Sequence, residues 1–397
     1  MDNAVYYIWL AQALGAGTRA AGELLRRYGG AKEIYSLDEY PQEARLSERQ
    51  RRVLADKDLT ASLAILEKCA RANVKVLCYG DPLFPERLRA ISAPPAVLYY
   101  RGVIKDLNSE YLVSVVGTRS MTEYGGKITE YFAGEFAAAG AVVVSGMASG
   151  IDSAAHRGCL AKSGYTVAIL GTAIDRPYPP ENAQLYDTIV RKGLVLSEYA
   201  PGSEYARNCF PKRNRLIAGI SNATLVTEAG ERSGALITAN DAIMQGKEVY
   251  ALPGLSGSKQ SVGTNTLLQK GVRLAYRPSD VLATAELMYP DKIRITAESY
   301  RTERYDTGAQ PHFTESRVSP DTGVEEVHDG YSYEKIGKLE PDEVTVVTAL
   351  RGAGGGLYID EVVASSGLDA GTVMSTLTVL EVYGVVSQKN DGRYVLV

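Results

Sequence analysis

Ten residues near the middle of the chain combine cations, an aromatic ring and a helical pattern. The stretch 210–219 reads Phe-Pro-Lys-Arg-Asn-Arg-Leu-Ile-Ala-Gly and carries Lys212, Arg213 and Arg215 within four residues. Its apolar second half predicts that these cations stand at the beginning of a helix. A helix N-terminus favours anions because its free N–H groups point outward, and the cations strengthen that field. We expect a phosphate site here, although a charge run alone is equally typical of a solvated helix face.

The element that must position these cations is a sheet, because residues 110–287 alternate short apolar runs with helical patterns. The predicted strands are 112–116, 141–144, 166–170, 194–196, 224–226 and 248–251. Helical patterns between them, such as 129–139 and 151–161, predict a parallel sheet with helices on both faces. In sheets of this α/β class, ligands bind beyond the carboxyl ends of the strands.

Small and polar residues follow five of the predicted strands. The residues in these loops that we expect to contact a ligand are Gly117, Arg119, Ser145, Gly146, Gly150, Ser233, Gly234, Thr238 and Asn265. Glycine lets a ligand approach the backbone, while hydroxyl groups and helix-start N–H groups donate to phosphate oxygens. Because the loops share one edge of one sheet, they predict a ligand that carries several phosphates.

The loop sequences argue against a dinucleotide cofactor. The first loop is Gly-Thr-Arg and not G-x-G-x-x-G, no acidic residue stands about 20 residues further on in a ribose-binding position, and the chain has no Walker sequence. Several anion sites along one edge suit a strand of nucleic acid better. Arg207 adds a cation just before the 210–219 helix, and Phe210 offers a ring on which an unpaired base can stack, for about 1–3 kcal/mol and without sequence preference. We therefore expect no cofactor.

The motifs that carry these residues resemble the signatures of the DNA-processing protein A family (DprA, also called Smf). They are 115–119, 145–152, 210–219, 233–239 and 263–265, in the order typical of the family. The resemblance covers about 75–287 and implies an extended Rossmann-like domain that binds single-stranded DNA. It also implies a homodimer that loads the RecA recombinase onto incoming single strands during natural transformation.

The resemblance further implies which residues line the DNA pocket. They are Arg119, Ser145, Gly146, Arg207, Phe210, Lys212, Arg213 and Arg215. We add Asn214, within the same helical motif, and the loop residues named above. On this interpretation the protein is a non-enzymatic DNA binder without catalytic residues.

The alternative is a hydrolase of the same superfamily that releases the base from a nucleoside monophosphate. The hallmark of those enzymes resembles a Pro-Gly-Gly-x-Gly-Thr loop with a glutamate in the next helical turn, where this chain has Leu-Ile-Thr at 236–238. Base release needs a positioned acid or nucleophile. The carboxylates that could still serve are Glu198, Glu228 and Glu231.

Asp152 and His156 are four residues apart on a predicted helix and could present two metal ligands. No third ligand is evident, and a carboxylate near a helix N-terminus is stabilised by the helix dipole alone. We therefore expect no metal.

The two ends of the chain predict smaller domains. Residues 1–72 predict a helical domain (helix-hairpin-helix or SAM-like) ahead of the Rossmann-like DNA-binding domain at 73–288. Within it, the glycine turn at 15–17 either brings backbone N–H groups to a DNA phosphate or is a plain helical hairpin. Residues 289–340 have no helical or strand period and are typical of a flexible linker.

Residues 341–397 predict a winged-helix-like domain with helices at 342–350, from 357, and at 369–380, followed by a hairpin. Its third helix has no Lys or Arg before Glu381. The domain holds three cations and seven anions, a net charge of −4, so it should repel duplex DNA. We expect a protein-contact or regulatory role for it.

Composition sets the remaining bounds. A chain of 397 residues is too long for one core, and 45 % apolar with 23 % charged residues is ordinary for a globular protein. The net charge of −4 means that any nucleic-acid contact must come from local patches. The four cysteines form no C-x-x-C pair and predict buried thiols in a reducing compartment. Without a signal-peptide pattern or an apolar run of about 18 residues, we expect a cytoplasmic protein with no membrane span.

Overall fold

The computed structural model describes residues 3–44, 46–204, 206, 208–301, 341–353, 356–382, 385–389 and 392–396. The chain divides into two compact units, residues 1–308 and 309–397. Most of the predicted linker, residues 302–340, lies outside the described residues.

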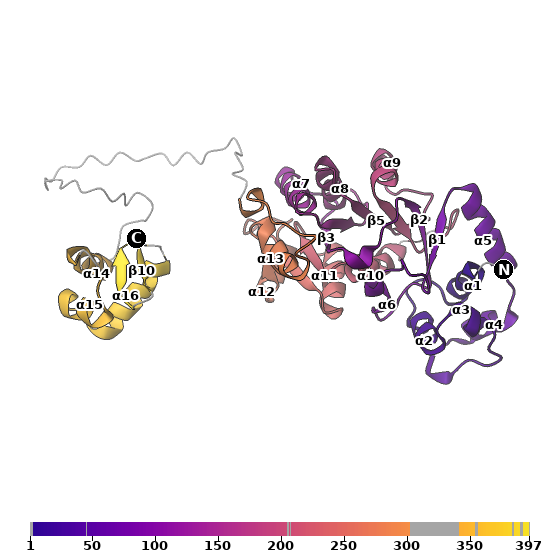
Figure 1. The fold of residues 1–397 in the computed structure, drawn as a ribbon, viewed down its shortest axis with the longest axis horizontal. Coiled ribbons are helices and arrows are strands. Elements are labelled where there is room, and N and C mark those ends of the chain that lie inside the picture. Colours follow the sequence, from indigo (N-terminus) through magenta and orange to yellow (C-terminus); the bar gives the residue numbers. More distant parts are fainter. Residues whose placement is uncertain are drawn as a thin grey trace. The chain divides into compact units, whose positions relative to one another are not determined.

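A nine-stranded sheet forms the centre of the described part of the first unit (Figure 1). Its strands are β1 (Lys75–Cys78), β2 (Val97–Gly102), β3 (Leu112–Val116), β4 (Val142–Ser145), β5 (Thr166–Leu170), β6 (Leu194–Ser197), β7 (Ala223–Val226), β8 (Glu248–Ala251) and β9 (Arg273–Leu274). The strand order is β1-β2-β6-β5-β4-β3-β7-β8-β9. From β6 to β9 all neighbours are parallel, while β1 and β2 extend the sheet in the antiparallel sense. The six strands predicted between 112 and 251 are confirmed.

The strand order reverses at β3. The chain runs from β3 outward through β4, β5 and β6, and then returns to the other side of β3 with β7. Val116 pairs with Val226, so β3 and β7 end at the same level. A crevice is expected where the order reverses, beyond the carboxyl ends of these strands.

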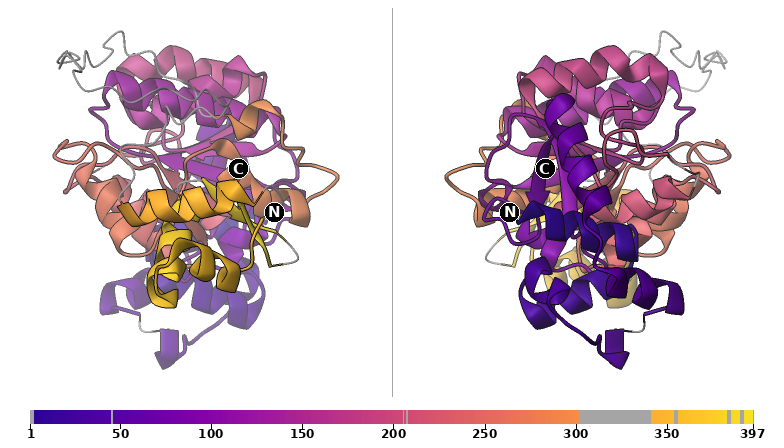
Figure 2. Two further views of the ribbon diagram at one scale, coloured as in Figure 1. Left: turned by 90° about the vertical axis from the view of Figure 1, so that its left-hand side faces the viewer. Right: turned by 90° about the vertical axis from the view of Figure 1, so that its right-hand side faces the viewer.

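Helices cover both faces of this sheet, as Figures 1 and 2 show. Its helices are α6 (Glu86–Arg89), α7 (Glu123–Ala138), α8 (Ile151–Ala161), α9 (Ala183–Lys192), α10 (Cys209–Ile220), α11 (Ala235–Met244), α12 (Val262–Gln269) and α13 (Pro278–Met288). Alternate residues of β3 face opposite cores, because Val113 and Val115 pack with α7 and α8 whereas Leu112 and Val116 belong to the core on the side of α10. This pattern follows from the period of two in a strand and confirms the predicted α/β class.

The N-terminal helices share a hydrophobic core with the sheet. They are α1 (Ala4–Leu14), α2 (Arg19–Tyr28), α3 (Ala31–Tyr35), α4 (Glu48–Asp56) and α5 (Thr60–Arg71). Ile8 and Leu24 lie in the same buried cluster as Leu98 of β2. The chain reverses between α1 and α2 at Gly15 and Gly17, each with φ of 78°, a conformation that glycine adopts without strain.

Residues 289–301, the first part of the predicted linker, pack on the first unit. Ile293 and Ser299 are buried, and the Ser299 hydroxyl donates to Glu135 Oε2 of α7 at 3.0 Å. The Tyr131 hydroxyl of α7 donates to the Glu298 carbonyl at 2.9 Å. Residues 289–301 therefore belong to the packed first unit, beyond the predicted boundary at 288, and Ser299 satisfies the buried carboxylate of Glu135.

The second unit consists of α14 (Pro341–Gly352), α15 (Ile359–Ser366), α16 (Ala370–Val382) and an antiparallel hairpin of β10 (Val386–Gln388) and β11 (Tyr394–Leu396). Apolar residues from all three helices and from β10 form its core, among them Leu350, Val362 and Leu377. The three helices and the hairpin of the predicted winged-helix-like domain are confirmed.

Two predictions from composition can be compared with the fold. The four cysteines are buried free thiols, as expected. Across the described ranges, no helix is both long enough and apolar enough to span a membrane.

Candidate functional site

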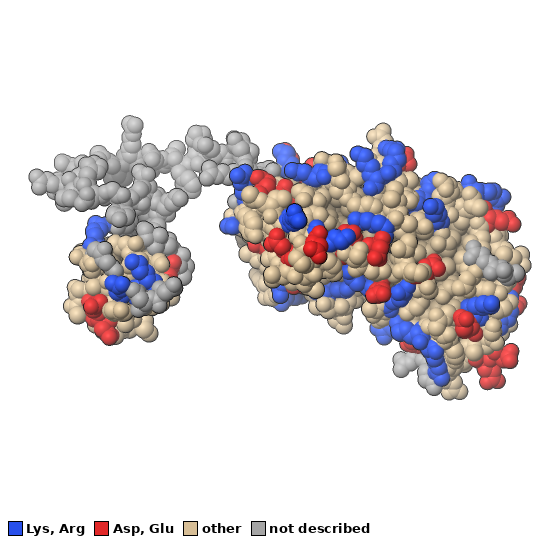
Figure 3. All heavy atoms as spheres, in the orientation of Figure 1, with Lys and Arg blue, Asp and Glu red and all other residues tan. Residues whose placement is uncertain are grey.

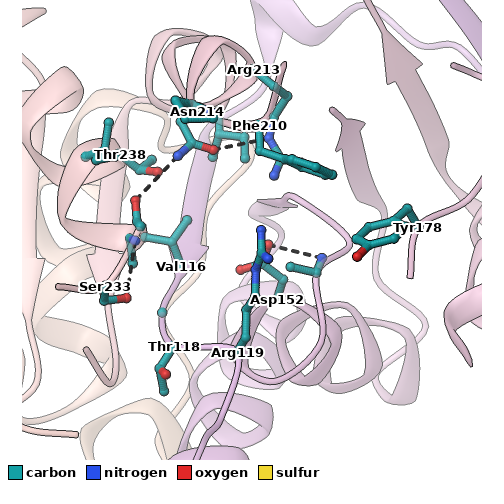
Figure 4. A pocket seen from close by; sticks show the side chains of 17 residues that line it. Val116, Thr118, Arg119, Asp152, Tyr178, Phe210, Arg213, Asn214, Ser233 and Thr238 are labelled. Atoms are coloured by element: carbon teal, nitrogen blue, oxygen red, sulfur yellow. Dashed lines mark hydrogen bonds between the residues drawn. The ribbon is translucent and has the colours of Figure 1, made fainter. Parts of the chain in front are cut away.

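A cavity of about 650 Å³ lies beyond the carboxyl ends of β3 and β7, where the strand order reverses. Five separate segments of the chain line it, and Figure 4 shows their side chains converging on the cavity. The predicted ligand-contacting residues that line it are Gly117, Arg119, Phe210, Arg213, Asn214, Ser233, Gly234 and Thr238. The parallel sheet thus brings the first loop, the start of α10 and the start of α11 to one place, as the sequence predicted.

A cation and two aromatic rings form one wall of this cavity. The guanidinium carbon of Arg119 lies 5.4 Å from the centroid of the Phe210 ring, a cation–π geometry. The Tyr178 ring lies 5.5 Å from Phe210, centroid to centroid, at an interplanar angle of 45°. Arg119 and Tyr178 are exposed, so a ligand can reach this wall from solvent.

Tyr178 was not among the residues predicted from the sequence. It comes from the long segment between β5 and α9, and only the fold carries this segment to the start of α10. The available signal was an aromatic residue in a loop that follows a predicted strand. A second cavity of about 240 Å³ shares Arg119, Tyr178 and Phe210 with the first, so the wall has ligand-sized space on two sides.

Arg213 forms part of the cavity floor and is only 5 % exposed. Its Nη1 donates to the Gly146 carbonyl at 2.6 Å and also to the Ile169 carbonyl. Burial lowers the pKa of Arg213 to about 10, and the nearby Asp152 opposes this effect. Arg213 therefore ties α10 to the ends of β4 and β5, which gives it a structural role beside any role in ligand binding.

Asp152 is buried beside Arg213 and accepts a hydrogen bond from the Ala148 N–H at 3.3 Å. Burial raises the pKa of Asp152, while the positive charge of Arg213 acts in the opposite direction. His156, one helical turn further on, is fully buried and its Nδ1 lies 2.7 Å from Thr166 Oγ1. Each residue thus has its own partner, and the described chain contains no group of three potential metal ligands.

The cations of α10 do not share one face of the helix. Arg215 forms a bidentate ion pair with Glu198, at 2.9 and 2.7 Å, and its Nε donates to the Ala93 carbonyl. It is not among the residues that line the cavity. Lys212 is exposed and lies outside the cavity lining. The predicted single cluster of phosphate ligands is therefore split into three environments.

The predicted loop residues also serve contacts within the protein. The Ser145 hydroxyl is buried and donates to the Val115 carbonyl at 2.7 Å. A Cβ on Gly146 would lie 2.5 Å from Arg213 Nη1, and one on Gly150, where φ is +79°, would lie 2.4 Å from the Thr118 carbonyl oxygen. These two glycines let loops pack against one another, and neither Ser145 nor Gly150 lines the cavity.

The last predicted residues fall in three different places. Asn265 exchanges two hydrogen bonds with the backbone of Gly254, at 3.1 and 3.0 Å, away from the cavity. The Ser233 hydroxyl accepts from the Ala235 N–H at the start of α11. Arg207 lies outside the described residues.

Two of the three carboxylates considered for hydrolysis are held by other groups. Glu228 is buried and accepts hydrogen bonds from the Thr122 N–H and hydroxyl at 2.8 and 2.7 Å, which orients the start of α7. Glu198 is paired with Arg215. Glu231 is exposed and does not line the cavity.

The sequence and fold match one group of known proteins. A family model described as DNA recombination-mediator protein A matches residues 75–286, and the DprA winged helix domain matches residues 335–392. Protein Smf of Synechocystis sp. is 33 % identical over 350 residues, covering 86 % of this chain and 85 % of that protein. DNA processing protein DprA of Streptococcus pneumoniae is 41 % identical over 206 residues, covering 52 % and 72 %.

Two solved structures agree. The X-ray structure of DNA processing protein A from Streptococcus pneumoniae has a TM-score of 0.62 and 32 % identity, covering 70 % of this chain and 97 % of that one. The structure of DNA processing protein A from Helicobacter pylori, described for its single-stranded DNA binding mode, has a TM-score of 0.50 and 31 % identity, covering 54 % of this chain and 97 % of that one. Together with the family match over more than half of its length, these relatives show that the chain belongs to the DNA recombination-mediator protein A (DprA/Smf) family.

Proposed function

We propose that this protein binds single-stranded DNA without sequence preference at the cavity beyond β3 and β7. The observation that carries the proposal is the wall formed by Arg119, Phe210 and Tyr178. Ring faces accept any unpaired base, and a neighbouring guanidinium can pair with a backbone phosphate. In a duplex the base faces are covered by their neighbours, so this wall favours single strands.

The family supports a role in DNA recombination. The family is named for a DNA recombination mediator, and the Helicobacter pylori relative is described by its binding of single-stranded DNA. We propose that the present chain acts as a homodimer in the cytoplasm and loads the RecA recombinase onto incoming single strands during natural transformation. On this proposal the protein is not an enzyme and needs no cofactor.

Fluorescence anisotropy of a labelled mixed-sequence oligonucleotide, single-stranded against duplex and titrated with salt, tests the binding step. We expect tight, salt-sensitive binding that prefers the single strand and is weakened by Arg119→Ala. No binding at low salt would reject the proposal. Release of free base from nucleoside monophosphates would then be measured, to test the hydrolase alternative.

The loading step needs a separate assay. RecA filament growth on single strands coated with a single-strand-binding protein would be followed with and without this chain. We expect the wild-type chain to shorten the lag before filament growth and the Arg119→Ala variant to do so less. An unchanged lag, in conditions where DNA binding is intact, would reject the loading role alone.

A further inference from the structure

A second basic surface lies where the turn between α1 and α2 meets α10. A Cβ placed on Gly17 of this turn would lie 3.5 Å from the Cγ atom of Lys212, so the turn packs directly beside the lysine stem. Arg19 follows two residues later and begins α2. Arg19 and Lys212 are both exposed. They are far apart in the sequence, and the fold brings the turn next to Lys212. We call Gly17, Arg19 and Lys212 the turn surface.

The local fold gives no reason for the charge of Arg19. It occupies the first position of α2, where the helix dipole favours anions and disfavours cations. By contrast, Arg26 lies in the last turn of the same helix, where the dipole stabilises a cation. Neither Arg19 nor Lys212 forms an ion pair with any residue in the described parts of the chain. Each of these two cations therefore lacks a counter-charge among the described residues, and an outside anion would supply one.

The turn surface adjoins the cavity. Lys212 follows directly after Phe210 and Pro211, which both line the cavity at the start of α10. The position of α2 is set by close packing, because a Cβ on Gly22 would lie 2.4 Å from Cδ of Pro94. In Figure 3 a band of Lys and Arg side chains covers the region that α2 and α6 occupy in Figure 1.

Acidic residues do not cancel this surface. Glu23, one turn after Arg19 on α2, is only partly exposed and forms no ion pair with a described residue. Glu198 lies on the same side of α10 as Arg215 and is neutralised by it at 2.7 Å. Arg19 and Lys212 outnumber the one unpaired carboxylate, Glu23, so the net charge of these three side chains is positive.

We infer that the turn surface binds the sugar–phosphate backbone of a single strand where the strand leaves the cavity. The inference rests on the proposed function and extends its site from the sheet onto the N-terminal helices. Backbone contacts of this kind carry no sequence information and release counterions, so they add affinity and salt dependence for any strand long enough to reach them.

Oligothymidylates of two lengths test this inference, because a strand of about 6 nucleotides fills little more than one site whereas about 20 nucleotides extend beyond it. Anisotropy titrations over a range of salt would compare Arg19→Ala, Arg19→Glu, Arg19→Lys and Lys212→Ala. The matched control is Arg71→Ala, an exposed arginine in the last turn of α5. Thermal unfolding of each variant checks that the fold is kept.

For the longer strand, we expect Arg19→Ala and Lys212→Ala to weaken binding several-fold and to lower the salt slope by about 0.7 each. Arg19→Glu should weaken it further, and Arg19→Lys should stay close to wild type. On the short strand the Arg19 variants should match Arg71→Ala.

Three outcomes would overturn the inference or its basis. If Arg19→Ala and Arg19→Glu match Arg71→Ala on the longer strand while Arg119→Ala weakens binding, the turn surface does not bind DNA and the proposed function stands. Equal losses of affinity for the short and the long strand would show a general effect on binding, and not contacts with the part of the strand beyond the cavity. If the wild type binds neither strand at low salt, the proposed function itself fails.

Discussion

The cavity of the first unit and helix α16 of the second unit are the two places where these folds commonly meet nucleic acid. They differ in chemistry. The cavity presents Arg119 beside two rings, whereas α16 has no Lys or Arg and exposes Met374 and Val379. The third helix of a winged helix often reads a DNA groove, but this one stands in a segment of net charge −4.

The difference teaches that the fold supplies a position and the side chains decide its use. A cation with stacking faces suits a single strand, while a helix that lacks cations and exposes apolar side chains suits a protein partner. We therefore propose that α16 contacts protein and that the cavity contacts DNA. Five predictions test this contrast, from the largest expected effect to the smallest.

Arg213→Ala should lower the free energy of unfolding of the first unit by about 3–5 kcal/mol, because it leaves Asp152 without its cation and frees two backbone carbonyls. Denaturant unfolding followed by circular dichroism would measure the loss. The transition of the second unit should not move. A stability equal to wild type would show that Arg213 does not hold the cavity together.

Arg119→Ala should weaken single-strand binding by about 1.5–3 kcal/mol, the range for a hydrogen bond to a charged group, because the phosphate partner on the cavity wall is lost. Anisotropy at fixed salt gives the value, with Arg71→Ala as the matched control. The fold should be unaffected since Arg119 is exposed. If both variants bound the single strand with equal affinity, Arg119 would not be a DNA-binding residue.

Phe210→Ala should weaken binding by about 1–3 kcal/mol for all sequences alike, because one stacking face is lost. The salt slope should stay at the wild-type value, since no phosphate contact is removed. Tyr178→Ala tests the second ring, and Tyr178→Phe is its control. A loss that depended on base sequence would contradict stacking as the role of these rings.

Acidification should destabilise the first unit through His156. Burial lowers its pKa from 6.5 to about 3, so below pH 6.5 the unfolded state binds a proton that the folded state does not. Stability from this group is complete above pH 6.5 and falls by up to about 1.4 kcal/mol per pH unit as the pH drops toward 3. The described part of the second unit contains no histidine.

The His156→Gln variant separates this effect from that of the carboxylates. Its free energy of unfolding would be measured by denaturant unfolding at about pH 7.5, 6 and 5, which span the loss expected from His156. This free energy should change less with pH than that of wild type. Identical pH dependence in the two proteins would mean that His156 does not titrate on unfolding.

Removing residues 302–397 should have the smallest effect. Single-strand affinity should change by less than about twofold, because the deleted segment is acidic and offers few cations to phosphates. Anisotropy of the shortened chain against the full chain measures this. A large loss of affinity for the single strand, or a loss of duplex binding, would contradict the proposal that DNA binds at the cavity while α16 contacts protein.

Much of this architecture could be predicted from local sequence. The strands β3 to β8 were predictable because each is a short apolar run between turn residues, and the start of α10 because its apolar half has a helical period. The convergence of Gly117, Phe210 and Ser233 also followed, since parallel strands end at one edge.

Only the tertiary structure decided how the cations of α10 divide. Successive residues of a helix are rotated by about 100°, so Arg213 points away from the side on which Lys212 and Arg215, three residues apart, are neighbours. Which of them is buried, paired with Glu198 or exposed depends on the elements that surround the helix. The contacts of Tyr178 with Phe210 and of Gly17 with Lys212 likewise join distant segments. Local propensity carries no information about such contacts, because they form only when the packed core brings the segments together.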